Sequence, residues 1–599
     1  MTQWIAGITR GHNGGVCLLK DGELVFAIEE ERLSRRKYDG APLASMLEIK
    51  KYTDKLDFLV VGHTQLMDRD CGRLEYSYEH IYVGLARKLG LIRDDSPDPD
   101  AKHPQVVDVG NVHHKLHAAC AFYRSGFEDA TAVVVDGAGT FIQFEVMGQE
   151  ETVWETETIF DCEFPNTINT KYKHLGTRGP CTTNYVTAMA AGEAYPGEEG
   201  TFSYVLDETA GIVKAYEAAT QYCGWHAIEA GKTMGLFPYG EPNDEVPTLF
   251  KKTGTVDRNV IVPTYPNAGH VNTQEYPFLN AHDSDDLTKL KNRRDFAYAV
   301  QTETQEAVLK LIYKAVEITG KKNVVLSGGY GLNCVANYWY LDKLKEDGIN
   351  LFVEPVSNDG GTAIGAALYV YYQSMAGMKK EVTLPPRITD LYHGPDYNYT
   401  IEEIIDTADK YGGVVSDAQN QDVIDLISKE NIVSLYQGKS EAGPRALGNR
   451  SILYDPRDPE GKDFVNTVKH REYFRPFAGS ILAEHAEEWF DLRGMEDTPF
   501  MMYAVKCQPG IEEKIPAIIH VDGTCRIQTV TQEQNKNYYD LIKAFYDATG
   551  CPILFNTSFN LGGEPLVETL DDACRTLSKS DIEYLYLPEF GKLITILND

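Results

Sequence analysis

The sequence predicts an α/β protein built from a large N-terminal domain and a smaller C-terminal one. Helix-like and strand-like patterns alternate along nearly the whole chain, which favours helices packed on sheets over a helical bundle or a sandwich. The chain has 599 residues, more than one hydrophobic core usually organises. A lysine pair and a proline pair interrupt the helical pattern within 379–390. We therefore expect a linker there, between domains at 1–378 and 391–599.

The composition excludes several classes of protein. Apolar residues make up 43% of the chain and charged residues 24%, and no stretch reaches the roughly 20 consecutive apolar residues of a membrane-spanning helix. Residues 1–8 run into a strand-like segment without the features of a signal peptide, so we expect a cytoplasmic location and no membrane partner. The formal charge of -32 argues against unspecific attraction to nucleic acid or acidic membranes.

The cysteine pattern is also typical of a cytoplasmic protein. Eleven cysteines, an odd number, are scattered from Cys17 to Cys574 without a CxxC pair. This spacing predicts neither a disulfide framework nor a thiolate zinc site. We expect reduced cysteines that are mostly buried.

Three glycine-marked turns follow apolar, strand-like runs in the first domain. The first turn, 9–15, separates two short strands, and the second begins with Asp136 at the end of a buried strand. The third contains Gly328, Gly329 and Asn333 and is flanked by predicted helices. Taken singly, each turn fits an ordinary hairpin or loop with glycine at positive φ.

Their order gives the three turns more weight. Glycines allow backbone N–H groups to close on phosphate oxygens, and a carboxylate at a strand end can hold the metal that accompanies a nucleotide. The order of hairpin, hairpin and helix-flanked turn resembles the ATPase fold shared by sugar kinases, actin and the heat-shock ATPase chaperones, known as the ASKHA fold. We expect this fold in the N-terminal domain.

A second pattern in the first domain is typical of a metal site. His113 and His117 are spaced i, i+4 in a predicted helix, so both imidazoles face the same way and could hold one cation. Asp136 and Asp359 lie beside glycine-rich turns, and two histidines with two aspartates suit iron, manganese or zinc. The alternative is a helix whose histidines only pack or cap. His114 is the spare histidine, for which substrate binding and exposure to solvent are both open.

Further motifs join these. In chain order they are Gly11-His12, Glu29-Glu30-Glu31-Arg32-Leu33-Ser34-Arg35, His113-His114-x-x-His117-Ala118, Gly231-Lys232-Thr233-Met234-Gly235-Leu236, Gly328-Gly329 with Asn333, Asn358-Asp359-Gly360-Gly361, Gly443-Pro444-Arg445-Ala446-Leu447-Gly448-Asn449-Arg450-Ser451, Lys469-x-Arg471-Glu472-x-Phe474-Arg475-Pro476-Phe477 and Asn556-Thr557-Ser558-Phe559-Asn560. With these residues the chain resembles, over nearly its whole length, the NodU and CmcH family of O-carbamoyltransferases, which act in nodulation-factor and antibiotic biosynthesis.

The resemblance implies a fold and a reaction. In that family the first domain is like the universal tRNA threonylcarbamoyl-transfer enzyme, and the second is a YrdC-like α/β domain. Carbamoyl phosphate and ATP accompanied by Mg²⁺ would give carbamoyl-adenylate in the second domain. The first domain would then transfer the carbamoyl group to a hydroxyl with the aid of Fe(II) or a similar divalent metal, held by His113, His117, Asp136 and Asp359.

The resemblance also implies roles for other residues. The implied catalytic residues are His12, His114, Lys439, Arg445, Lys469 and Arg471. The implied nucleotide-binding or cofactor-binding residues are Lys232, Gly328, Gly329, Asn333, Arg450, Arg475, Asn556, Ser558 and Asn560. His12 or His114 would accept the proton of the hydroxyl, because neutral imidazole is a competent base near pH 7.

The C-terminal part of this set can also be interpreted without the resemblance. Residues 431–480 hold eight Lys and Arg against six Asp and Glu, and guanidinium groups suit the oxygens of carbamoyl phosphate and ATP. A solvated surface charge network is the alternative. Residues 556–560 follow the apolar run 553–555, so their polar side chains should emerge at a strand end, although a plain turn would look the same.

Two positions depart from the family pattern. Leu116 stands where a small residue is expected before the second metal histidine, and Thr140 stands where Glu is expected. The acceptor therefore cannot be inherited from the family. We expect an insertion with long loops at about 151–290 to shape its pocket, and a small metabolite or sugar as acceptor in preference to a 5-hydroxymethyl base in DNA. A sugar-kinase-like phosphotransferase and a regulatory nucleotide-binding protein remain the alternative functions.

Overall fold

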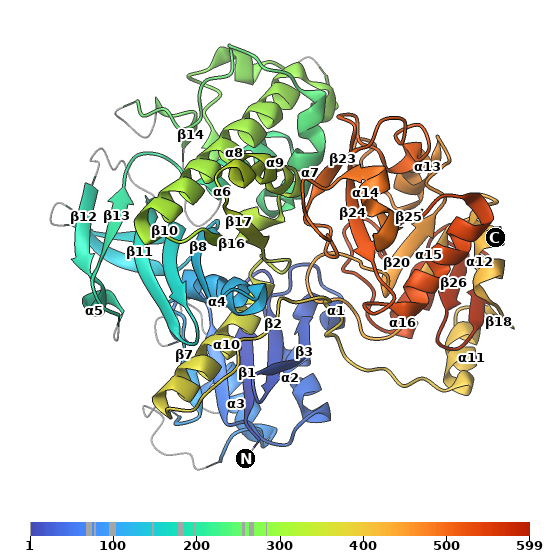
Figure 1. Cartoon of the computed structure of the whole chain (residues 1–599), viewed down its shortest axis with the longest axis horizontal. Coiled ribbons are helices and arrows are strands. Elements are labelled where there is room, and N and C mark those ends of the chain that lie inside the picture. The colour runs from blue at the N-terminus through green and yellow to red at the C-terminus, as the bar shows by residue number, and fades with distance from the viewer. Residues whose placement is uncertain are drawn as a thin grey trace. The chain divides into compact units, whose positions relative to one another are not determined.

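The computed structural model describes residues 2–67, 75–76, 79–94, 103–146, 149–177, 185–195, 198–253, 258–262, 269–282 and 284–598. Its chain path is drawn in Figure 1. The chain forms two compact units, Met1–Val25 with Ala41–Ile388 and Phe26–Gly40 with Thr389–Asp599. In the described part, no helix combines the length and apolarity that a membrane crossing requires.

The N-terminal segment Phe26–Gly40 belongs to the second unit, which the sequence did not predict. Helix α1 (Glu30–Ser34) carries Arg32, which donates hydrogen bonds to the carbonyls of Glu441 at 3.2 Å and Gly443 at 2.9 Å. Arg35 donates to the carbonyl of Leu566 at 2.6 Å. These bonds tie the segment to backbone far away in sequence, a pairing that local patterns cannot indicate.

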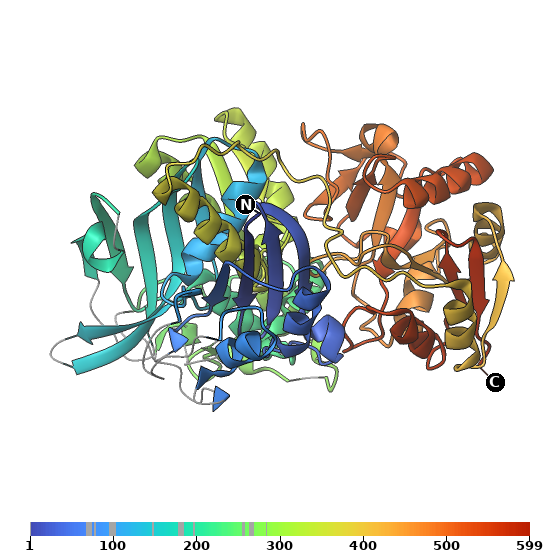
Figure 2. The ribbon, with the colours of Figure 1, turned by 90° about the horizontal axis from the view of Figure 1, so that it is seen from below.

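The first sheet of the first unit has the strand order β3-β2-β1-β4-β7. Strand β1 pairs with β2 in an antiparallel hairpin and with β4 in parallel, and β4 and β7 are also parallel. The strands are β1 (Trp4–Thr9), β2 (Gly15–Lys20), β3 (Glu23–Glu29), β4 (Phe58–Gly62) and β7 (Val106–Asp108). Figure 2 shows the sheet edge-on beside helix α10 (Gly360–Gly377).

The second sheet repeats this topology. Its order is β12-β13-β11-β10-β8-β16-β17, within which β8 pairs with β10 in an antiparallel manner and with β16 in parallel. Five strands of the second sheet, β11-β10-β8-β16-β17, thus follow the same order as β3-β2-β1-β4-β7, and β9, β12 and β13 are additional strands of the second sheet. The strands are β8 (Asp129–Val135), β9 (Phe141–Val146), β10 (Gln149–Glu163), β11 (Thr167–Thr177), β12 (Tyr185–Ala190), β13 (Thr201–Leu206), β16 (Asn323–Ser327) and β17 (Asn350–Val353).

This duplicated arrangement confirms the predicted ATPase-type N-terminal domain. The remaining helices of the unit are α2 (Leu43–Glu48), α3 (Ile81–Lys88), α4 (His113–Ser125), α5 (Ala191–Ala194), α6 (Ile212–Tyr222), α7 (Ala230–Leu236), α8 (Lys291–Thr319) and α9 (Cys334–Glu346). Short strand pairs are formed by β5 (Glu75–Tyr76) with β6 (Glu79–His80) and by β14 (Ile261–Val262) with β15 (His270–Val271).

The region 151–290 differs from the expected loop-rich insertion, because its first strands belong to the second sheet. A cluster of buried side chains, including Val153, Leu175 and Leu206, packs on this part of the sheet. Apolar residues therefore fix the segment to the core of the unit. Within the expected insertion, 178–184, 196–197, 254–257, 263–268 and 283 lie outside the described residues.

Helices α4 and α10 approach each other closely, and this contact positions the site described below. A Cβ atom added at Gly365 would lie 1.9 Å from the carbonyl oxygen of Leu116 on α4. Only glycine permits this approach of one helix to the backbone of the other. All residues of α4 are buried, so the side of the helix that carries the histidines faces the interior of the unit.

The second unit is an α/β domain around one ten-stranded sheet, which confirms the predicted fold class. The strand order is β18-β27-β26-β19-β20-β25-β21-β24-β23-β22. The strands are β18 (Val414–Asp417), β19 (Val433–Tyr436), β20 (Arg450–Tyr454), β21 (Ala478–Leu482), β22 (Phe490–Asp491), β23 (Ala504–Cys507), β24 (Thr524–Val530), β25 (Ile553–Ser558), β26 (Tyr584–Leu587) and β27 (Lys592–Thr595). The helices are α11 (Ile401–Asp409), α12 (Asn420–Ile427), α13 (Gly461–Val468), α14 (Ala486–Trp489), α15 (Lys536–Thr549) and α16 (Leu570–Leu577).

Candidate functional site

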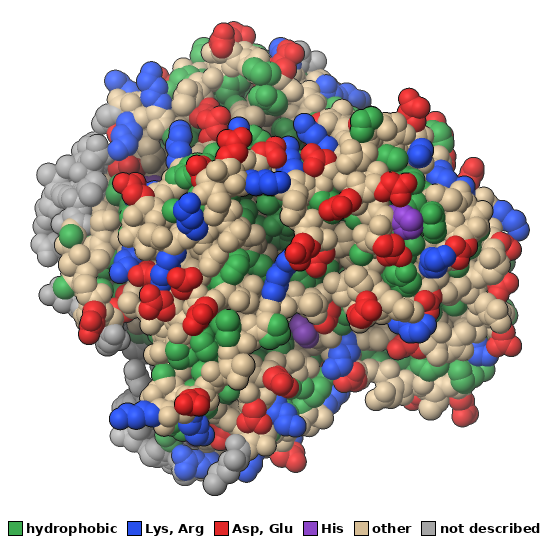
Figure 3. All heavy atoms as spheres, in the orientation of Figure 1, with side chains coloured by type: hydrophobic (Ala, Val, Ile, Leu, Met, Phe, Trp, Pro, Cys, Tyr) green, Lys and Arg blue, Asp and Glu red, His purple; other side chains and the backbone are tan. Residues whose placement is uncertain are grey.

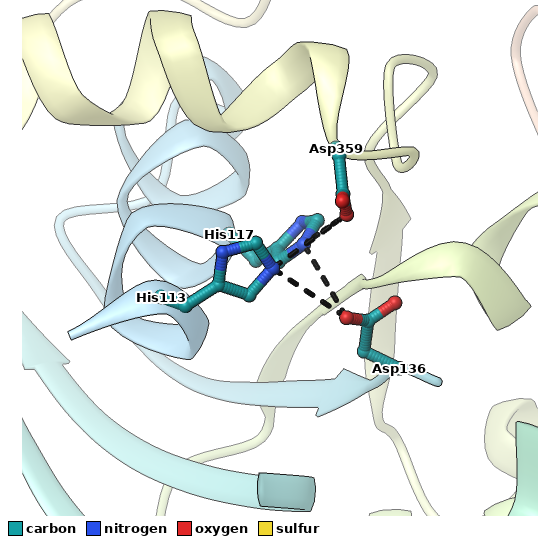
Figure 4. A group of neighbouring side chains, drawn as sticks. All are labelled: His113, His117, Asp136 and Asp359. Carbon is teal, nitrogen blue, oxygen red and sulfur yellow. Dashed lines mark ion pairs between the residues drawn. The ribbon is translucent and has the colours of Figure 1, made fainter. Parts of the chain in front are cut away.

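Two histidines and two aspartates meet inside the first unit (Figure 4). His113 and His117 come from successive turns of α4, Asp136 directly follows β8, and Asp359 precedes α10. One ligand atom from each of the four lies within 4.8 Å of the others. The structure thus brings together all four residues expected to bind the metal.

The distances in this cluster show two imidazoles facing two carboxylates. His113 Nε2 lies 3.5 Å from Asp136 Oδ2 and 3.6 Å from Asp359 Oδ1. His117 Nε2 lies 3.9 Å from Asp136 Oδ2 and 3.5 Å from Asp359 Oδ1. These spacings are longer than hydrogen bonds and leave the ligand atoms directed at a common point, as Figure 4 shows.

The residues present fit a divalent cation. The Nε2 atoms of His113 and His117 are buried and make no hydrogen bond. Burial by itself lowers the pKa of His113, yet Asp136 and Asp359 outweigh it and raise this pKa to about 10. A cation held here would replace that proton, because two imidazoles and two carboxylates suit iron, manganese or zinc.

The two candidate proton acceptors differ in accessibility. His12 Nδ1 lies 3.6 Å from Asp359 Oδ2, and the His12 side chain is 50% exposed. His114 is fully buried, and its Nδ1 lies 2.7 Å from the hydroxyl of Thr158. Burial lowers the pKa of His114 to about 4. Of the two, His12 is the one that a substrate hydroxyl could reach.

The unexpected residues at positions 116 and 140 both have defined contacts. Leu116 is fully buried, and a Cβ at Gly62 would lie 3.0 Å from its Cδ1, so a small residue opposite makes room for the larger side chain. The Thr140 hydroxyl accepts from the His113 N–H at 3.0 Å, and the Thr140 N–H donates to Glu155 at 2.9 Å. Both residues therefore support helix α4, which carries His113 and His117.

One residue of the third glycine turn, Gly329, contacts the cluster of His and Asp residues. Gly329 N–H donates to Asp136 Oδ1 at 3.1 Å, and Gly328 has a φ of +86° with the backbone of β8 close by. The Asn333 side chain instead caps α9 through the N–H of Ala336. Lys232 pairs with Glu229 at 2.8 Å. The nucleotide contacts expected of Asn333 and Lys232 stay predictions.

The second unit gathers a separate set of cations beside the end of β25. Lys469 is buried, and its Nζ donates to the carbonyl of Ser558 and to Asn560 Oδ1, the latter at 3.3 Å. Arg471 donates to the Thr557 hydroxyl at 3.3 Å. The structure thus brings the two motifs around 469–477 and 556–560 together.

Positive charge is concentrated in this group. Burial, followed by Arg471 and Arg475, lowers the pKa of Lys469 well below its usual value. Burial, Arg475 and Arg526 likewise lower the pKa of Arg471. Sequence reasoning missed Arg526, which lies on β24 and carries no motif signal. Cations that lower one another's pKa in this way favour a bound anion, because the anion would offset their repulsion.

Arg450 occupies a different environment from the one expected. It is fully buried and donates to the carbonyls of Gln437 at 2.6 Å and Asn449 at 2.9 Å, with its guanidinium 3.8 Å from the Tyr436 ring centroid. Further bonds run to the carbonyls of Gly438 and Glu568. These contacts favour a structural role over the expected nucleotide contact.

Asn556, Arg445 and Lys439, which the resemblance also implies, lie in or beside the loop 437–449. Asn556 is buried and donates to the Ser480 hydroxyl at 2.9 Å and to the Ala446 carbonyl at 3.2 Å. Arg445 is partly exposed in the loop that contains Ala446. Lys439 pairs with Asp396 at 3.2 Å. That Lys439 and Arg445 share an anion site with the group around Lys469 stays a prediction.

Two family models match the chain. The model described as Carbamoyltransferase N-terminus matches residues 51–368, and the one described as Carbamoyltransferase C-terminus matches residues 424–592. The chain belongs to the carbamoyltransferase family. The first match contains all four clustered His and Asp residues, and the second contains Lys469 and Asn560.

Relatives of this carbamoyltransferase include nodulation proteins. Nodulation protein NolNO of Sinorhizobium fredii is 30% identical over 97% of this chain and 78% of the relative. Nodulation protein NolO of Bradyrhizobium diazoefficiens is 31% identical over 80% of this chain and 78% of the relative. Among solved structures, full-length HypF in a phosphate- and nucleotide-bound form is 12% identical, with a TM-score of 0.35 over 63% of this chain and 56% of that one.

The family assignment confirms the resemblance inferred from the motifs and makes the protein a carbamoyltransferase enzyme. It disfavours the sugar-kinase alternative, which would not account for matches in both halves of the chain.

Proposed function

We propose that this carbamoyltransferase makes carbamoyl-adenylate from carbamoyl phosphate and ATP in its second unit and transfers the carbamoyl group to an acceptor hydroxyl in its first. The observation that carries the proposal is the presence of two chemically different sites. One gathers Lys469, Arg471 and Arg475, which suit phosphate oxygens. The other gathers His113, His117, Asp136 and Asp359, which suit a metal.

The first step needs an environment for several phosphate charges. Water cleaves the O–P bond of carbamoyl phosphate and leaves carbamate and phosphate. A carbamate oxygen then attacks the α-phosphorus of ATP, and pyrophosphate departs. Lys469, Arg471 and Arg475 would neutralise these anions, and their own mutual repulsion would fall in the process. Mg²⁺ would accompany ATP.

The second step needs a base and a polarised carbonyl. The acceptor hydroxyl attacks the carbamoyl carbon, AMP leaves, and His12 takes the hydroxyl proton, since its side chain is exposed beside the metal cluster. A divalent cation such as Fe(II), held by the four clustered residues, would polarise the carbonyl and stabilise the oxyanion. Asp359 would orient His12 as well as bind the cation, because it contacts both His12 and His117.

The proposed acceptor is a small hydroxylated metabolite or a sugar. The chain carries a formal charge of -32, and on the face drawn in Figure 3 the described Lys and Arg side chains are interspersed with Asp and Glu. A DNA acceptor would need a field of positive charge to meet its phosphates. A 5-hydroxymethyl base in DNA is therefore the less favoured acceptor.

Incubation with labelled carbamoyl phosphate and ATP tests the proposal. The enzyme should release pyrophosphate and phosphate only when both substrates are present, and should yield AMP and a carbamoylated product once an acceptor is added. A phosphotransferase would ignore carbamoyl phosphate, and a regulatory nucleotide-binding protein would consume neither substrate. Untargeted mass spectrometry for the carbamoyl mass increment would then identify the acceptor.

A further inference from the structure

The metal-binding face of α4 continues beyond its two histidine ligands. His113, His117, Cys120 and Arg124 follow one another at spacings of four, three and four residues, which places them on one side of the helix. Arg124 is buried, and its Nη1 donates to Glu354 Oε1 at 2.6 Å and to Cys120 Sγ at 3.5 Å. The same helix face thus holds the metal ligands at one end and a buried ion pair at the other.

Glu354 stands at the start of the turn that leads to Asp359. It follows β17, and its Oε1 accepts from the N–H of Val356 at 2.9 Å as well as from Arg124. Its backbone carbonyl accepts from the hydroxyl of Ser357. The side chain and the carbonyl of one residue therefore fold the turn 354–359 and attach it to α4.

The close packing around this turn leaves it little freedom. A Cβ at Gly361 would lie 2.0 Å from the carbonyl oxygen of Val356 and 3.5 Å from Cys120 Sγ. A shift of the turn along α4 would move Asp359 relative to the His117 imidazole. The pair of Arg124 and Glu354 lies where such a shift would begin.

The pair is badly placed to serve stability alone. The exposed fractions of the two side chains are 5% and 0%, and the Nε and Nη2 atoms of Arg124 are buried without a hydrogen bond. Desolvation of two such charges often exceeds their attraction, so that apolar replacements of both residues are frequently neutral or stabilising. Its value to the protein must then lie in geometry.

We infer that the ion pair of Arg124 with Glu354 is a positioning device: it fixes Asp359 relative to His113 and His117 and thereby sets the affinity for the divalent cation. The inference rests on the proposed metal binding and adds two residues that lie outside the four clustered His and Asp residues. Groups that orient metal ligands commonly change metal affinity by about 10-fold to 100-fold when they are removed.

The test is a titration of the metal-free protein with Fe(II) under anaerobic conditions against a chromophoric chelator. Glu354→Gln should have a lower Tm than the wild type, because it leaves the buried Arg124 guanidinium without its carboxylate, and at temperatures where it is folded it should bind Fe(II) about 10-fold to 100-fold more weakly. Asp161→Asn is the matched control, because it removes the ion pair with Lys321 at 2.6 Å in the same unit and should leave Fe(II) affinity unchanged. Equal affinity of Glu354→Gln and the wild type would overturn the inference.

A double variant separates positioning from folding. Arg124→Met with Glu354→Met removes both charges, so it should fold with a Tm at or above that of the wild type and still bind Fe(II) at least about 10-fold more weakly. Recovery of wild-type affinity in the double variant would reduce the pair to a structural role. If the wild-type chain binds no Fe(II), the proposed metal site itself fails, a result distinct from equal binding by all variants.

Discussion

His12 and Asp359 lie side by side at the edge of the metal cluster, with His12 Nδ1 3.6 Å from Asp359 Oδ2. The carboxylate therefore contacts a half-exposed imidazole as well as the two buried ones. Asp359 therefore holds His12, the proposed base, beside the atoms that would bind a cation. This arrangement distinguishes His12 from the buried His114.

The first prediction concerns that base. His12→Asn should lower the rate of carbamoyl transfer by about 10²-fold to 10⁴-fold, the range usual for loss of a positioned general base. Metal content and pyrophosphate release should remain, since His12 is outside the four clustered residues and outside the second unit. Elemental analysis and a pyrophosphate assay on the same preparation check both points, and an undiminished transfer rate would exclude the role.

The second prediction concerns metal occupancy. His117→Ala should empty the site without unfolding the chain, because the scaffold of α4, β8 and α10 is packed independently of the ligand atoms. Purified protein would be measured by elemental analysis and by thermal unfolding. His103→Ala is the control and should keep its metal, because His103 is a buried histidine that bonds to the backbone of Arg93 and Gln105 and is not one of the four clustered residues. Full occupancy in His117→Ala would refute the ligand assignment.

Much of the metal cluster could be predicted because its signals are local. The spacing of His113 and His117 indicates a shared helix face, and Asp136 and Asp359 sit beside glycine turns that the sequence reveals. Their convergence was invisible, since it depends on the packing of α4 against α10 through Gly365. The order of the strands in the two sheets could not be predicted directly. The three glycine turns indicated it only through their resemblance to a known fold.

The two differences between the sequence prediction and the structure, the unit of segment 26–40 and the environment of Arg450, have a common physical cause. Segment 26–40 belongs to the second unit because Arg32 and Arg35 donate hydrogen bonds to backbone carbonyls far away in sequence. The guanidinium of Arg450 likewise donates its hydrogen bonds to four backbone carbonyls. Arginine side chains look alike in a sequence whether they bind a substrate or the backbone. Lys469, Arg471 and Arg475 were expected to contact anions because they belong to a motif of the family, whereas Arg526 lies within a regular strand.

The third prediction is a pH dependence of stability. His174 Nδ1 lies 2.6 Å from Glu157 and Nε2 3.4 Å from Asp207; burial opposes protonation, but these carboxylates raise the pKa of His174 from 6.5 to about 10. Because the folded pKa exceeds the unfolded one, the stabilisation is complete below pH 6.5 and disappears as the pH rises through 10. The Tm difference between wild type and His174→Gln should therefore be large at pH 6 and small above pH 10, and a constant difference would contradict it.

The fourth prediction concerns nucleic acid. Duplex DNA without hydroxymethylated bases should bind weakly and should lose affinity steeply as salt increases, because only a local group of cations could meet its phosphates in a chain of charge -32. Fluorescence anisotropy over a salt series would measure this. Tight binding that is insensitive to salt would reopen DNA as the acceptor.

The last prediction separates the two half-reactions by mutation. Lys469→Ala or Arg445→Ala should remove anion contacts worth about 1.5–3 kcal/mol each, as is usual for charge-assisted hydrogen bonds, and so suppress pyrophosphate release that depends on carbamoyl phosphate. Transfer would then fail for lack of intermediate. Their control is Lys543→Ala, which removes an exposed pair with Asp547 in the same unit and should leave both steps unchanged.

His113→Ala should have the opposite effect. Pyrophosphate release should persist, because His113 lies in the first unit, whereas no carbamoyl group should appear on the acceptor and the adenylate should decay to hydrolysis products. Parallel assays of pyrophosphate, AMP and carbamoylated product on folded variants distinguish the steps. If Lys469→Ala and His113→Ala lost pyrophosphate release equally while both remained folded, the two-site proposal would give way to one shared site.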